Sequence, residues 1–479
     1  HGVGNEEITW SFTTEAAPQD EDDEESPPDN DDGAPSGSND GTPGSGQAAA
    51  PEQSDGVRMN ADGSAVLEGG AVNVRQETTA DGRTMTTAVV DAAALTSAIE
   101  TLSANAGSQG SARITVELND AADLAVVDLP ASALRAGASL APGLIVSIQT
   151  PDAGYDLPAD LIDTEGLAAE LGAAQEDLKV TVKMEKVAGA AADAIQQRAA
   201  ASGLQIIGTP IEFRVSVEAN GQSKELTNFG NTYVSRTIVL TQSTSGLALS
   251  AVLIDPVTGE MTFVPSVLTE TENGTIMTIK RTGNSIYAIV SGEKTFRDIA
   301  GHWAKDDIEL LASKLLIKGV SEEAFAPDQA ITRAEFAVLL VRGLGLTAQT
   351  NTAVFLDVSG EEWYAGAIGA AVEAGLINGF TDGTFRPNAT ITREEMGVMI
   401  ARALAFSGNG TAVDADTGLK RFADHAAISS WAKAQVAVSV EAGIIAGYTD
   451  GSFAPHQTAT RAEAAVMLKR LLLYAAFIN

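Results

Sequence analysis

Four short motifs recur in the same order three times between residues 296 and 474. Such internal repetition constrains the fold more than any other feature of the chain, because each copy must adopt a similar structure. Each copy opens with Phe-x-Asp and a tryptophan, continues through a stretch with apolar residues three and four apart, and reaches a Phe-x-Pro loop and a Thr-Arg-x-Glu motif. The pattern predicts two helices and one intervening loop per repeat.

The Thr-Arg-x-Glu motifs, at residues 332–335, 392–395 and 460–463, predict the start of each second helix. A threonine N-cap with a glutamate three residues later is a capping box, in which each side chain satisfies a free backbone N–H. The arginine between them is unfavourable beside the positive end of a helix dipole. Its recurrence therefore suggests an anionic partner, and its forked donors suit a carboxylate.

With these motifs, residues 296–474 resemble three S-layer homology domains. The resemblance implies an all-α-type pseudo-threefold bundle of helix-loop-helix repeats, here bounded at 295–346, 354–406 and 421–474. It also implies that grooves between repeats bind a secondary cell wall polysaccharide attached to peptidoglycan, often one that carries pyruvylated N-acetylmannosamine. By the same analogy, the pyruvate carboxylate would contact Arg333, Arg393 and Arg461.

The loop that precedes each Phe-x-Pro motif differs among the copies. Repeats two and three carry Gly-x-x-Asp-Gly, whereas the first repeat has Glu323 at the place of the second glycine. A glutamate resists a positive φ and adds negative charge near an anion site, so we expect the groove built from this loop to bind poorly. The ligand-binding residues expected from all motifs are Arg333, Arg393, Arg461, Trp303, Trp363, Trp431, Gly379, Asp382, Gly383, Gly447, Asp450 and Gly451.

Several of these residues also have a purely structural interpretation. The three tryptophans lie at the starts of amphipathic helices, which favours packing in the core or groove wall over stacking on sugars. The aspartates of Phe-x-Asp, namely Asp298, Asp357 and Asp424, are expected to be N-caps or turn anchors. Asp382 and Asp450 are expected to bond within their own loops, with a sugar hydroxyl as a second partner. His302, His425 and His456 share no position, so no metal site is expected.

Charge and composition exclude several classes of binding partner and of chemical site. The chain has 30 Lys plus Arg against 64 acidic residues, a net charge of −34, which disfavours nucleic acid and anionic lipid. It has no cysteine, which excludes disulfides, thiolate metal sites and a Cys nucleophile. No uninterrupted apolar stretch reaches the roughly 18 residues of a membrane-spanning helix. The chain begins with His1 rather than Met, so we expect a fragment.

The first 56 residues divide into two segments. Residues 8–14 alternate, with Ile8, Trp10 and Phe12 on one strand face, and residues 1–14 resemble the end of a bacterial Ig-like domain. Residues 15–56 are acidic and rich in Pro, Gly and Ser, so we expect a disordered linker. Weak Ca²⁺ binding by its acidic run is the alternative, but the spacing of an EF-hand loop is missing.

Residues 57–294 predict an α+β or β-rich extracellular module of unknown role. Expected strands are 112–118, 144–148, 178–184, 211–217, 234–240, 252–254, 261–264, 275–280 and 286–290, and expected helices are 91–102, 164–171 and 187–201. No histidine occurs between His1 and His302, and no tryptophan between Trp10 and Trp303. A histidine acid or base is therefore absent, although a pair of catalytic carboxylates is not excluded by counting.

Together these features predict a secreted, non-enzymatic anchor located at the cell wall or surface layer, without cofactor or metal. Two alternatives stay open. In the first, residues 57–294 or a missing upstream domain hydrolyse a polysaccharide, and the repeats tether the enzyme; convergent carboxylates in a deep cleft would favour it. In the second, the chain is a lattice protein that self-associates in a surface layer, which exposed apolar sheet edges would favour.

Overall fold

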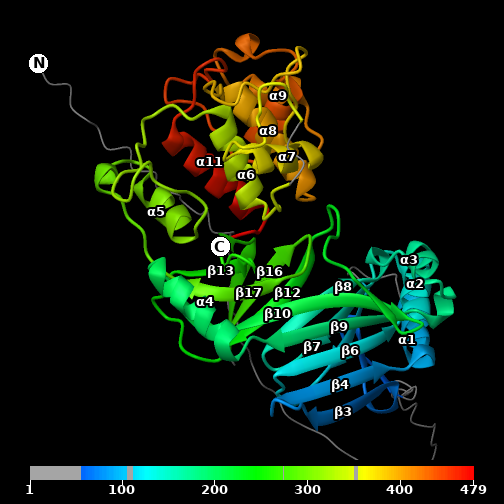
Figure 1. Ribbon diagram of the computed structural model, residues 1–479. Helices are drawn as coiled ribbons and strands as arrows, with labels where there is room; N and C mark the ends of the chain where they lie inside the picture. Colours follow the sequence, from blue (N-terminus) through cyan, green and yellow to red (C-terminus); the bar gives the residue numbers. More distant parts are fainter. Residues whose placement is uncertain (1–55, 105–111, 273, 350–353) are drawn as a thin grey trace, which may run out of the picture. The chain divides into compact units, whose positions relative to one another are not determined.

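The computed structural model describes residues 56–104, 112–272, 274–349 and 354–479 (Figure 1). The expected Ig-like strand at 8–14 and, apart from Gly56, the expected linker at 15–56 lie outside the described residues. The described N-terminal part is sheet-rich, and the repeat region is helical, in agreement with the predicted mixed architecture.

Two sheets form the N-terminal part. The eight-stranded sheet has the order β1 (Val57–Met59), β2 (Ala65–Leu67), β5 (Arg113–Glu117), β7 (Ile145–Gln149), β8 (Ala153–Pro158), β12 (Val234–Leu240), β16 (Gly274–Arg281), β15 (Ser266–Thr271). The nine-stranded sheet has the order β14 (Met261–Phe263), β13 (Leu249–Ile254), β17 (Ile286–Ser291), β10 (Gln205–Ala219), β9 (Lys179–Lys186), β6 (Leu124–Pro130), β4 (Thr84–Val90), β3 (Val72–Thr78), with β11 (Gln222–Glu225) paired to β10. Most pairs are antiparallel, but β2 with β5, β5 with β7, and β4 with β6 are parallel.

Alternating sequence patterns give these strands one buried face. Every second residue of β12, from Val234 to Leu240, is buried, and β6 and β16 alternate in the same way. This period of two is the geometry of a half-buried strand. Most buried residues of both sheets join one core around the aromatic side chains Tyr155, Phe213 and Tyr287. Other buried residues of β13 and β17 form a separate cluster with Ile195 and Ala199.

Four α-helices accompany the sheets: α1 (Ala92–Ala104), α2 (Ala131–Leu140), α3 (Thr164–Leu171) and α4 (Gly189–Ala201). Figure 1 shows α1, α2 and α3 gathered at the same end of the strands. The Asp91 carboxylate caps α1 by accepting the Ala94 N–H at 2.8 Å. Helix α3 has the predicted bounds 164–171, and its N-cap is Asp163, whose carboxylate accepts the Gly166 N–H at 3.0 Å.

Each repeat contributes two α-helices, as predicted. The helices are α5 (Lys305–Ser313) and α6 (Arg333–Gly343), α7 (Ala365–Glu373) and α8 (Arg393–Phe406), and α10 (Lys433–Glu441) and α11 (Arg461–Tyr474); the short α9 (Ala415–Leu419) precedes the third repeat. One apolar cluster contains buried residues from all three repeats. Among its members, Phe325, Phe385 and Phe453 are at most 2% exposed and pack on Phe296, Phe355 and Phe422.

Short 3-10 turns complete the described secondary structure, at Gly69–Ala71, Ala159–Leu161, Gln175–Asp177, Arg297–Ile299 and His425–Ala427. Within the described ranges, no helix combines the length and apolar character needed to cross a membrane.

Candidate functional site

The three segments that lead into the second helices hydrogen-bond to one another in a closed ring. The Ile331 amide donates to the Ala459 carbonyl at 3.0 Å, the Ala459 amide to the Ile391 carbonyl at 3.0 Å, and the Ile391 amide to the Ile331 carbonyl at 3.1 Å. Each segment therefore depends on both of the others. Residues 60, 68 and 128 positions apart along the chain are brought together at this ring.

The Thr-Arg-x-Glu arginines extend the same cyclic order to side chains. Each Nε donates to the phenylalanine carbonyl of the following repeat's Phe-x-Pro loop, all at 2.9 Å: Arg333 to Phe385, Arg393 to Phe453 and Arg461 to Phe325. Each Nη1 also contacts a capping-box glutamate: Arg333 with Glu395 at 2.7 Å, Arg393 with Glu463 at 3.1 Å and Arg461 with Glu335 at 3.4 Å. The first repeat thus binds the second, the second binds the third, and the third binds the first.

These contacts identify the anion that faces the arginine at the start of each second helix. The anionic partner of each arginine is a glutamate of the next repeat, so the recurrence of arginine does not by itself require an external anion. The three arginine side chains are only 8%, 3% and 11% exposed. Burial lowers the pKa of Arg333 and Arg461, and the facing glutamates Glu395 and Glu335 oppose that shift.

All three capping boxes are present as predicted. The glutamate of each box has two functions. In the third repeat, Oε2 of Glu463 accepts the Thr460 N–H at 2.8 Å, while Oε1 accepts from Arg393 at 3.1 Å and from the Tyr448 hydroxyl at 2.7 Å. One residue therefore caps its own helix and pairs with the neighbouring repeat.

The aspartates of the Phe-x-Asp motifs are turn anchors, as predicted. In each repeat the two carboxylate oxygens accept the amides of the loop phenylalanine and of the residue after it. Asp382 and Asp450 bond within their own loops, to Thr384 and Ser452 respectively. Bonds from Thr384 and Arg386 lower the pKa of Asp382 to about 2.

The loop glycines are required for two different reasons, a positive φ at one pair and a close approach of other atoms at the other pair. Gly383 and Gly451 have φ of 79° and 81°, which side chains with a Cβ rarely adopt. Gly379 and Gly447 instead lie against other atoms. A Cβ on Gly379 would stand 2.3 Å from the Phe355 ring and 2.7 Å from the Thr384 carbonyl oxygen.

Replacing Gly379 by alanine is therefore expected to lower the free energy of unfolding by about 1–3 kcal/mol, because the backbone carbonyl cannot move away freely. Urea denaturation followed by circular dichroism measures this change. The matched control is Gly418→Ala in α9, whose new methyl group would meet only Val413 at an ordinary 3.9 Å. Equal effects of the two substitutions would contradict the close-approach explanation.

The loop of the first repeat has Glu323 in place of the second glycine and adopts a different backbone conformation there. Glu323 is not among the described residues with positive φ, yet its carbonyl accepts the Arg297 amide at 2.8 Å, as Gly383 and Gly451 accept from Leu356 and Ala423. Its carboxylate pairs with Arg297 at 2.9 Å. The expected strain is therefore absent at Glu323, and its charge has a partner.

A pocket of about 270 Å³ lies beside this same loop. Its lining includes Lys318, Gly319 and Val320 from the loop, Glu335 and Arg342 from α6, Trp363 from the second repeat and Arg461 from the third. Val320 stands where the other repeats have Phe380 and Tyr448, whose rings lie 4.8 Å from Arg333 and 4.4 Å from Arg393. Because Val320 has no aromatic ring, the Arg461 guanidinium lacks the equivalent ring contact at this position.

The tryptophans do not pack in the core, and that part of the prediction is wrong. Trp303, Trp363 and Trp431 are 67%, 64% and 56% exposed. Each lies in the turn just before its helix rather than on the apolar face of the helix, which explains the difference. Trp363 lines the pocket described above.

The described residues contain no group of three or more His, Cys, Asp or Glu side chains placed to ligate a metal. His302 contacts Asp328 at 3.4 Å and His456 contacts Glu394 at 3.3 Å, while His425 faces the Phe422 carbonyl.

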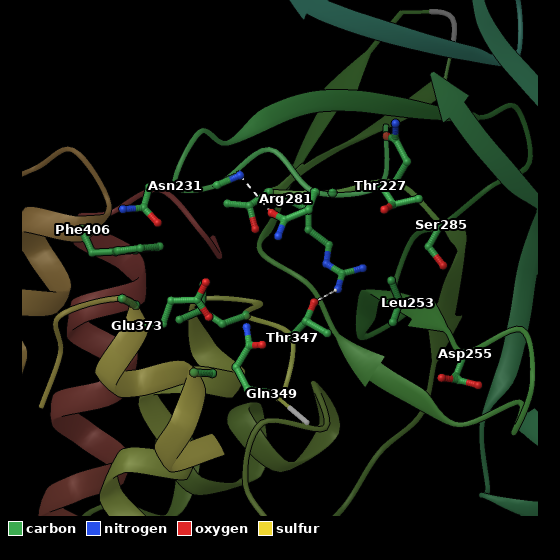
Figure 2. Close-up of a pocket in the computed structure, with 18 of the residues that line it drawn as sticks. Thr227, Asn231, Leu253, Asp255, Arg281, Ser285, Thr347, Gln349, Glu373 and Phe406 are labelled. Carbon is green, nitrogen blue, oxygen red and sulfur yellow. Dashed lines mark hydrogen bonds between the residues drawn. The ribbon is translucent and has the colours of Figure 1, made fainter. Parts of the chain in front are cut away.

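A second pocket, of about 430 Å³, lies between the loop 227–231, the turn 281–285 and residues 346–349 (Figure 2). None of the predicted site residues lines it. Its lining combines a buried arginine, Arg281, with neutral polar side chains and with two acidic residues, Asp255 and Glu373.

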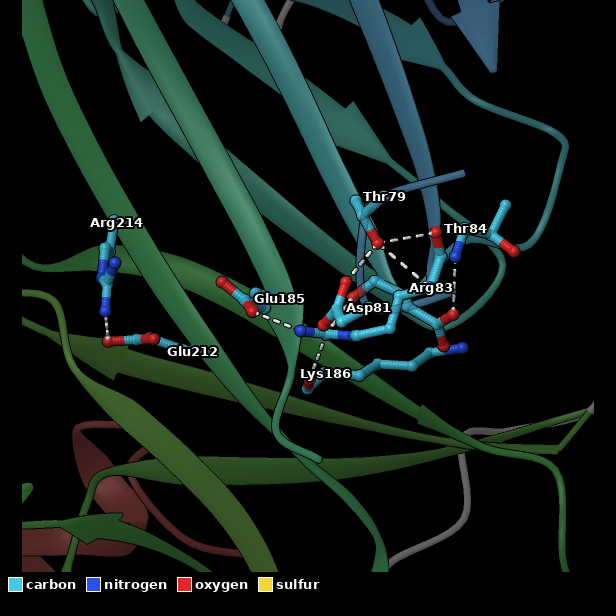
Figure 3. Close-up of polar contacts among 9 residues, drawn as sticks. Thr79, Asp81, Arg83, Thr84, Glu185, Lys186, Glu212 and Arg214 are labelled. Atoms are coloured by element: carbon cyan, nitrogen blue, oxygen red, sulfur yellow. Dashed lines mark hydrogen bonds and ion pairs between the residues drawn. The ribbon is translucent and has the colours of Figure 1, made fainter. Parts of the chain in front are cut away.

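Two glutamates on the nine-stranded sheet are paired with arginines (Figure 3). Glu185 contacts Arg83 at 2.6 Å and Glu212 contacts Arg214 at 2.6 Å, and nearby Lys186 contacts Asp152 at 2.7 Å. Hydrogen bonds from Ser64, Thr79 and Thr258 lower the pKa of the Asp62, Asp81 and Asp255 carboxyls respectively. A general acid for glycoside hydrolysis needs the opposite shift.

Comparison with known proteins identifies the repeats. Residues 295–337, 354–396 and 421–465 match the S-layer homology domain. The chain is 39% identical to amylopullulanase of Thermoanaerobacterium thermosulfurigenes over 219 residues, which are 46% of this chain and 11% of that protein. It is 32% identical to S-layer protein sap of Bacillus anthracis over 40% of this chain and 23% of that protein. It is 35% identical to the cellulosome-anchoring protein of Acetivibrio thermocellus over 33% of this chain and 35% of that protein.

The chain thus spans 11% to 35% of the length of these relatives. The predicted S-layer homology repeats are confirmed. The matched domains, with relatives named for surface layers and for anchoring, indicate a surface-anchoring module and a cell-wall or surface location.

Proposed function

Because the chain carries three S-layer homology domains, we propose that it anchors a larger surface protein non-covalently to the cell wall, by binding a secondary cell wall polysaccharide attached to peptidoglycan. The observation that carries this proposal is the pocket at Arg461. It is lined by three cations, Lys318, Arg342 and Arg461, and by one carboxylate, Glu335, which contacts Arg461, in a chain whose net charge is −34.

We propose that the three repeats, at 295–346, 354–406 and 421–474, form a pseudo-threefold bundle that follows residues 57–294 as a separate module. The ring of amide bonds and the cyclic order of the arginines support this arrangement. Grooves between neighbouring repeats would bind the polymer through Arg333, Arg393, Arg461, Trp303, Trp363, Trp431, Gly379, Asp382, Gly383, Gly447, Asp450 and Gly451.

The groove at Arg461 is the one we propose to bind most strongly. Its positive charge suits an acidic substituent such as a pyruvate ketal, and the 64% exposed Trp363 ring offers a face on which a sugar can stack. The Glu323 carboxylate does not line this pocket. The sequence alone favours weak binding at the groove built from the first repeat's loop, and we propose the opposite, that this groove binds the polymer well.

Several weak grooves acting on one polymer would increase the overall affinity, because later contacts form within an already bound complex. The chain itself needs no catalytic group for this function.

Self-association in a surface layer is a second proposal. Strand β3 ends the nine-stranded sheet, and Val74 on it and Val89 on β4 are 46% and 48% exposed. An unpaired edge of this kind can template pairing with another chain.

Co-sedimentation with wall sacculi tests the anchor. We expect the chain to pellet with native sacculi and not with sacculi stripped of their secondary polymer. Lys318→Glu should raise the half-saturating concentration at least about tenfold, because a charge-assisted contact contributes about 1.5–3 kcal/mol. Arg75→Glu on β3 makes the same charge change on another exposed surface and should leave binding within about threefold.

Equal pelleting with native and stripped sacculi would refute the polymer as the ligand. Equal effects of Lys318→Glu and Arg75→Glu would refute the Arg461 groove as the main site, and leave only general charge repulsion.

A further inference from the structure

The 430 Å³ pocket of Figure 2 contains a buried cation that is paired with no carboxylate of the described residues. Arg281 is 8% exposed. Its Nη2 donates to the Thr347 hydroxyl at 2.7 Å and its Nε to the Gly345 carbonyl at 3.4 Å, both neutral groups. Among the described residues, no carboxylate lies within 4.0 Å of this guanidinium.

A second unpaired cation lies directly behind the pocket wall. Arg236 is fully buried, and its Nη2 donates to Oδ1 of Asn284, a lining residue, at 3.1 Å. Its Nη1 donates to the Tyr287 hydroxyl at 3.3 Å, while its Nε is buried and has no hydrogen-bond partner in the described structure. No described carboxylate pairs with Arg236 either.

Buried charges are costly unless they are paired. Arg236 lies behind the wall and gains partial compensation from the Tyr155 and Tyr287 rings, 5.5 and 5.0 Å from its guanidinium. Arg281 lines the pocket without such a partner, and its charge favours an anionic occupant.

Two acidic residues also line the pocket, but neither neutralises the arginines. The Asp255 carboxylate accepts the Val257 and Thr258 amides of its own turn, and Glu373 is exposed on α7. The local field at Arg281 is therefore positive within a strongly negative chain.

The remainder of the lining is rich in neutral hydrogen-bonding groups. Thr227, Asn228, Asn231, Thr282 and Ser285 present hydroxyl and amide groups, and Phe406 adds an apolar surface. Such groups fit the hydroxyls and the ring face of a sugar. The volume lies within the range of about 300–1,000 Å³ that is usual for small-ligand sites.

We propose that this pocket binds a small acidic sugar of the uronate class, with its carboxylate at Arg281 and its hydroxyls against the 227–231 loop and the 281–285 turn. The site is separate from the Arg461 groove, since the two pockets share no lining residue. The inference does not depend on the proposed wall anchor.

Isothermal titration calorimetry of the full chain with glucuronate, glucose and inorganic sulfate tests the proposal. We expect glucuronate to bind, and glucose and sulfate to bind at least tenfold more weakly. Thr347→Glu places a carboxylate beside Arg281 and should weaken glucuronate binding at least tenfold. Thr347→Gln has the same size without the charge and should retain affinity within threefold.

The results separate the parts of the proposal. Glucose binding as tightly as glucuronate would overturn the role of the arginines, and sulfate binding as tightly would overturn the role of the sugar. Absence of glucuronate binding, or equal affinities of Thr347→Glu and Thr347→Gln, would overturn the site itself. Lys318→Glu, in the other pocket, should leave this binding unchanged whatever its effect on sacculi. Unchanged circular dichroism and melting temperature verify that each variant is folded.

Discussion

Replacing Glu463 by alanine is expected to lower the free energy of unfolding of the repeats by about 3–5 kcal/mol, because it leaves a buried guanidinium unpaired. The side chain of Arg393 is only 3% exposed and contacts Glu463 at 3.1 Å. The same substitution removes the acceptor of the Thr460 N–H at 2.8 Å, and so one half of the capping box of α11. Urea denaturation followed at 222 nm measures the loss.

Two further variants separate charge from capping. Glu463→Gln retains an oxygen for the Thr460 N–H but removes the charge, so we expect an intermediate loss. In the double variant Arg393→Met/Glu463→Ala, no unpaired charge is left, and we expect it to be more stable than Glu463→Ala alone. A double variant that is less stable than Glu463→Ala would contradict the unpaired-charge explanation.

Tyr448 gives an independent readout of the same site. Burial, together with the hydrogen bond from its hydroxyl to Glu463, raises the pKa of Tyr448 to about 12. We expect this pKa to fall toward the ordinary value of about 10 in Glu463→Ala, as measured by ultraviolet absorbance during an alkaline titration. An unchanged tyrosine pKa would show that Glu463 does not face the hydroxyl in solution.

The capping boxes and loop anchors were predictable because they depend on residues close in sequence. Thr332 and Glu335 are three positions apart, and Asp382 bonds to Thr384 two positions away. Local hydrogen bonds of this kind form similar geometry wherever the motif occurs. The helix starts at Arg333, Arg393 and Arg461 follow from them.

The partners of the arginines were not predictable by the same reasoning. Arg461 contacts Glu335 and the Phe325 carbonyl, 126 and 136 positions earlier in the chain. An unfavourable cation at a helix start indicates that some anion is near, but not whether it is a ligand or another repeat. Only the cyclic order of the repeats decides between the two, and that order comes from long-range contacts.

In the sheets, too, local sequence patterns predict the bounds of some strands but not which strands pair with each other. Strand β12 was predicted with its observed bounds, because the pattern from Val234 to Leu240 alternates strictly. Its neighbours are β8 and β16, and no local signal selects them. Eight of the described strands were missed altogether, namely β1, β2, β3, β4, β6, β8, β11 and β15. Most residues of β3 are exposed, so it lacks an apolar period.

Removing residues 421–479 is expected to unfold the first two repeats as well. The ring would lose Ala459, which bonds to both Ile331 and Ile391, and Arg461 would no longer pair with Glu335. Helix α11 packs on α5 and α6, so its loss would expose their apolar faces at about 1.5–3 kcal/mol for each large side chain. A chain ending at residue 420 should therefore lose the helical signal of residues 295–406, and a protease should cleave within them.

A chain ending at residue 294 is the control for this experiment, because it shows the signal of the sheets without any repeat. If the chain ending at 420 has the same helical content as this control, the repeats fold as one cooperative unit. If residues 295–406 instead resist the protease and retain their helices, the first two repeats are stable without the third. The ring contacts would then join preformed repeats, and single substitutions such as Glu463→Ala would weaken one groove without affecting the other two.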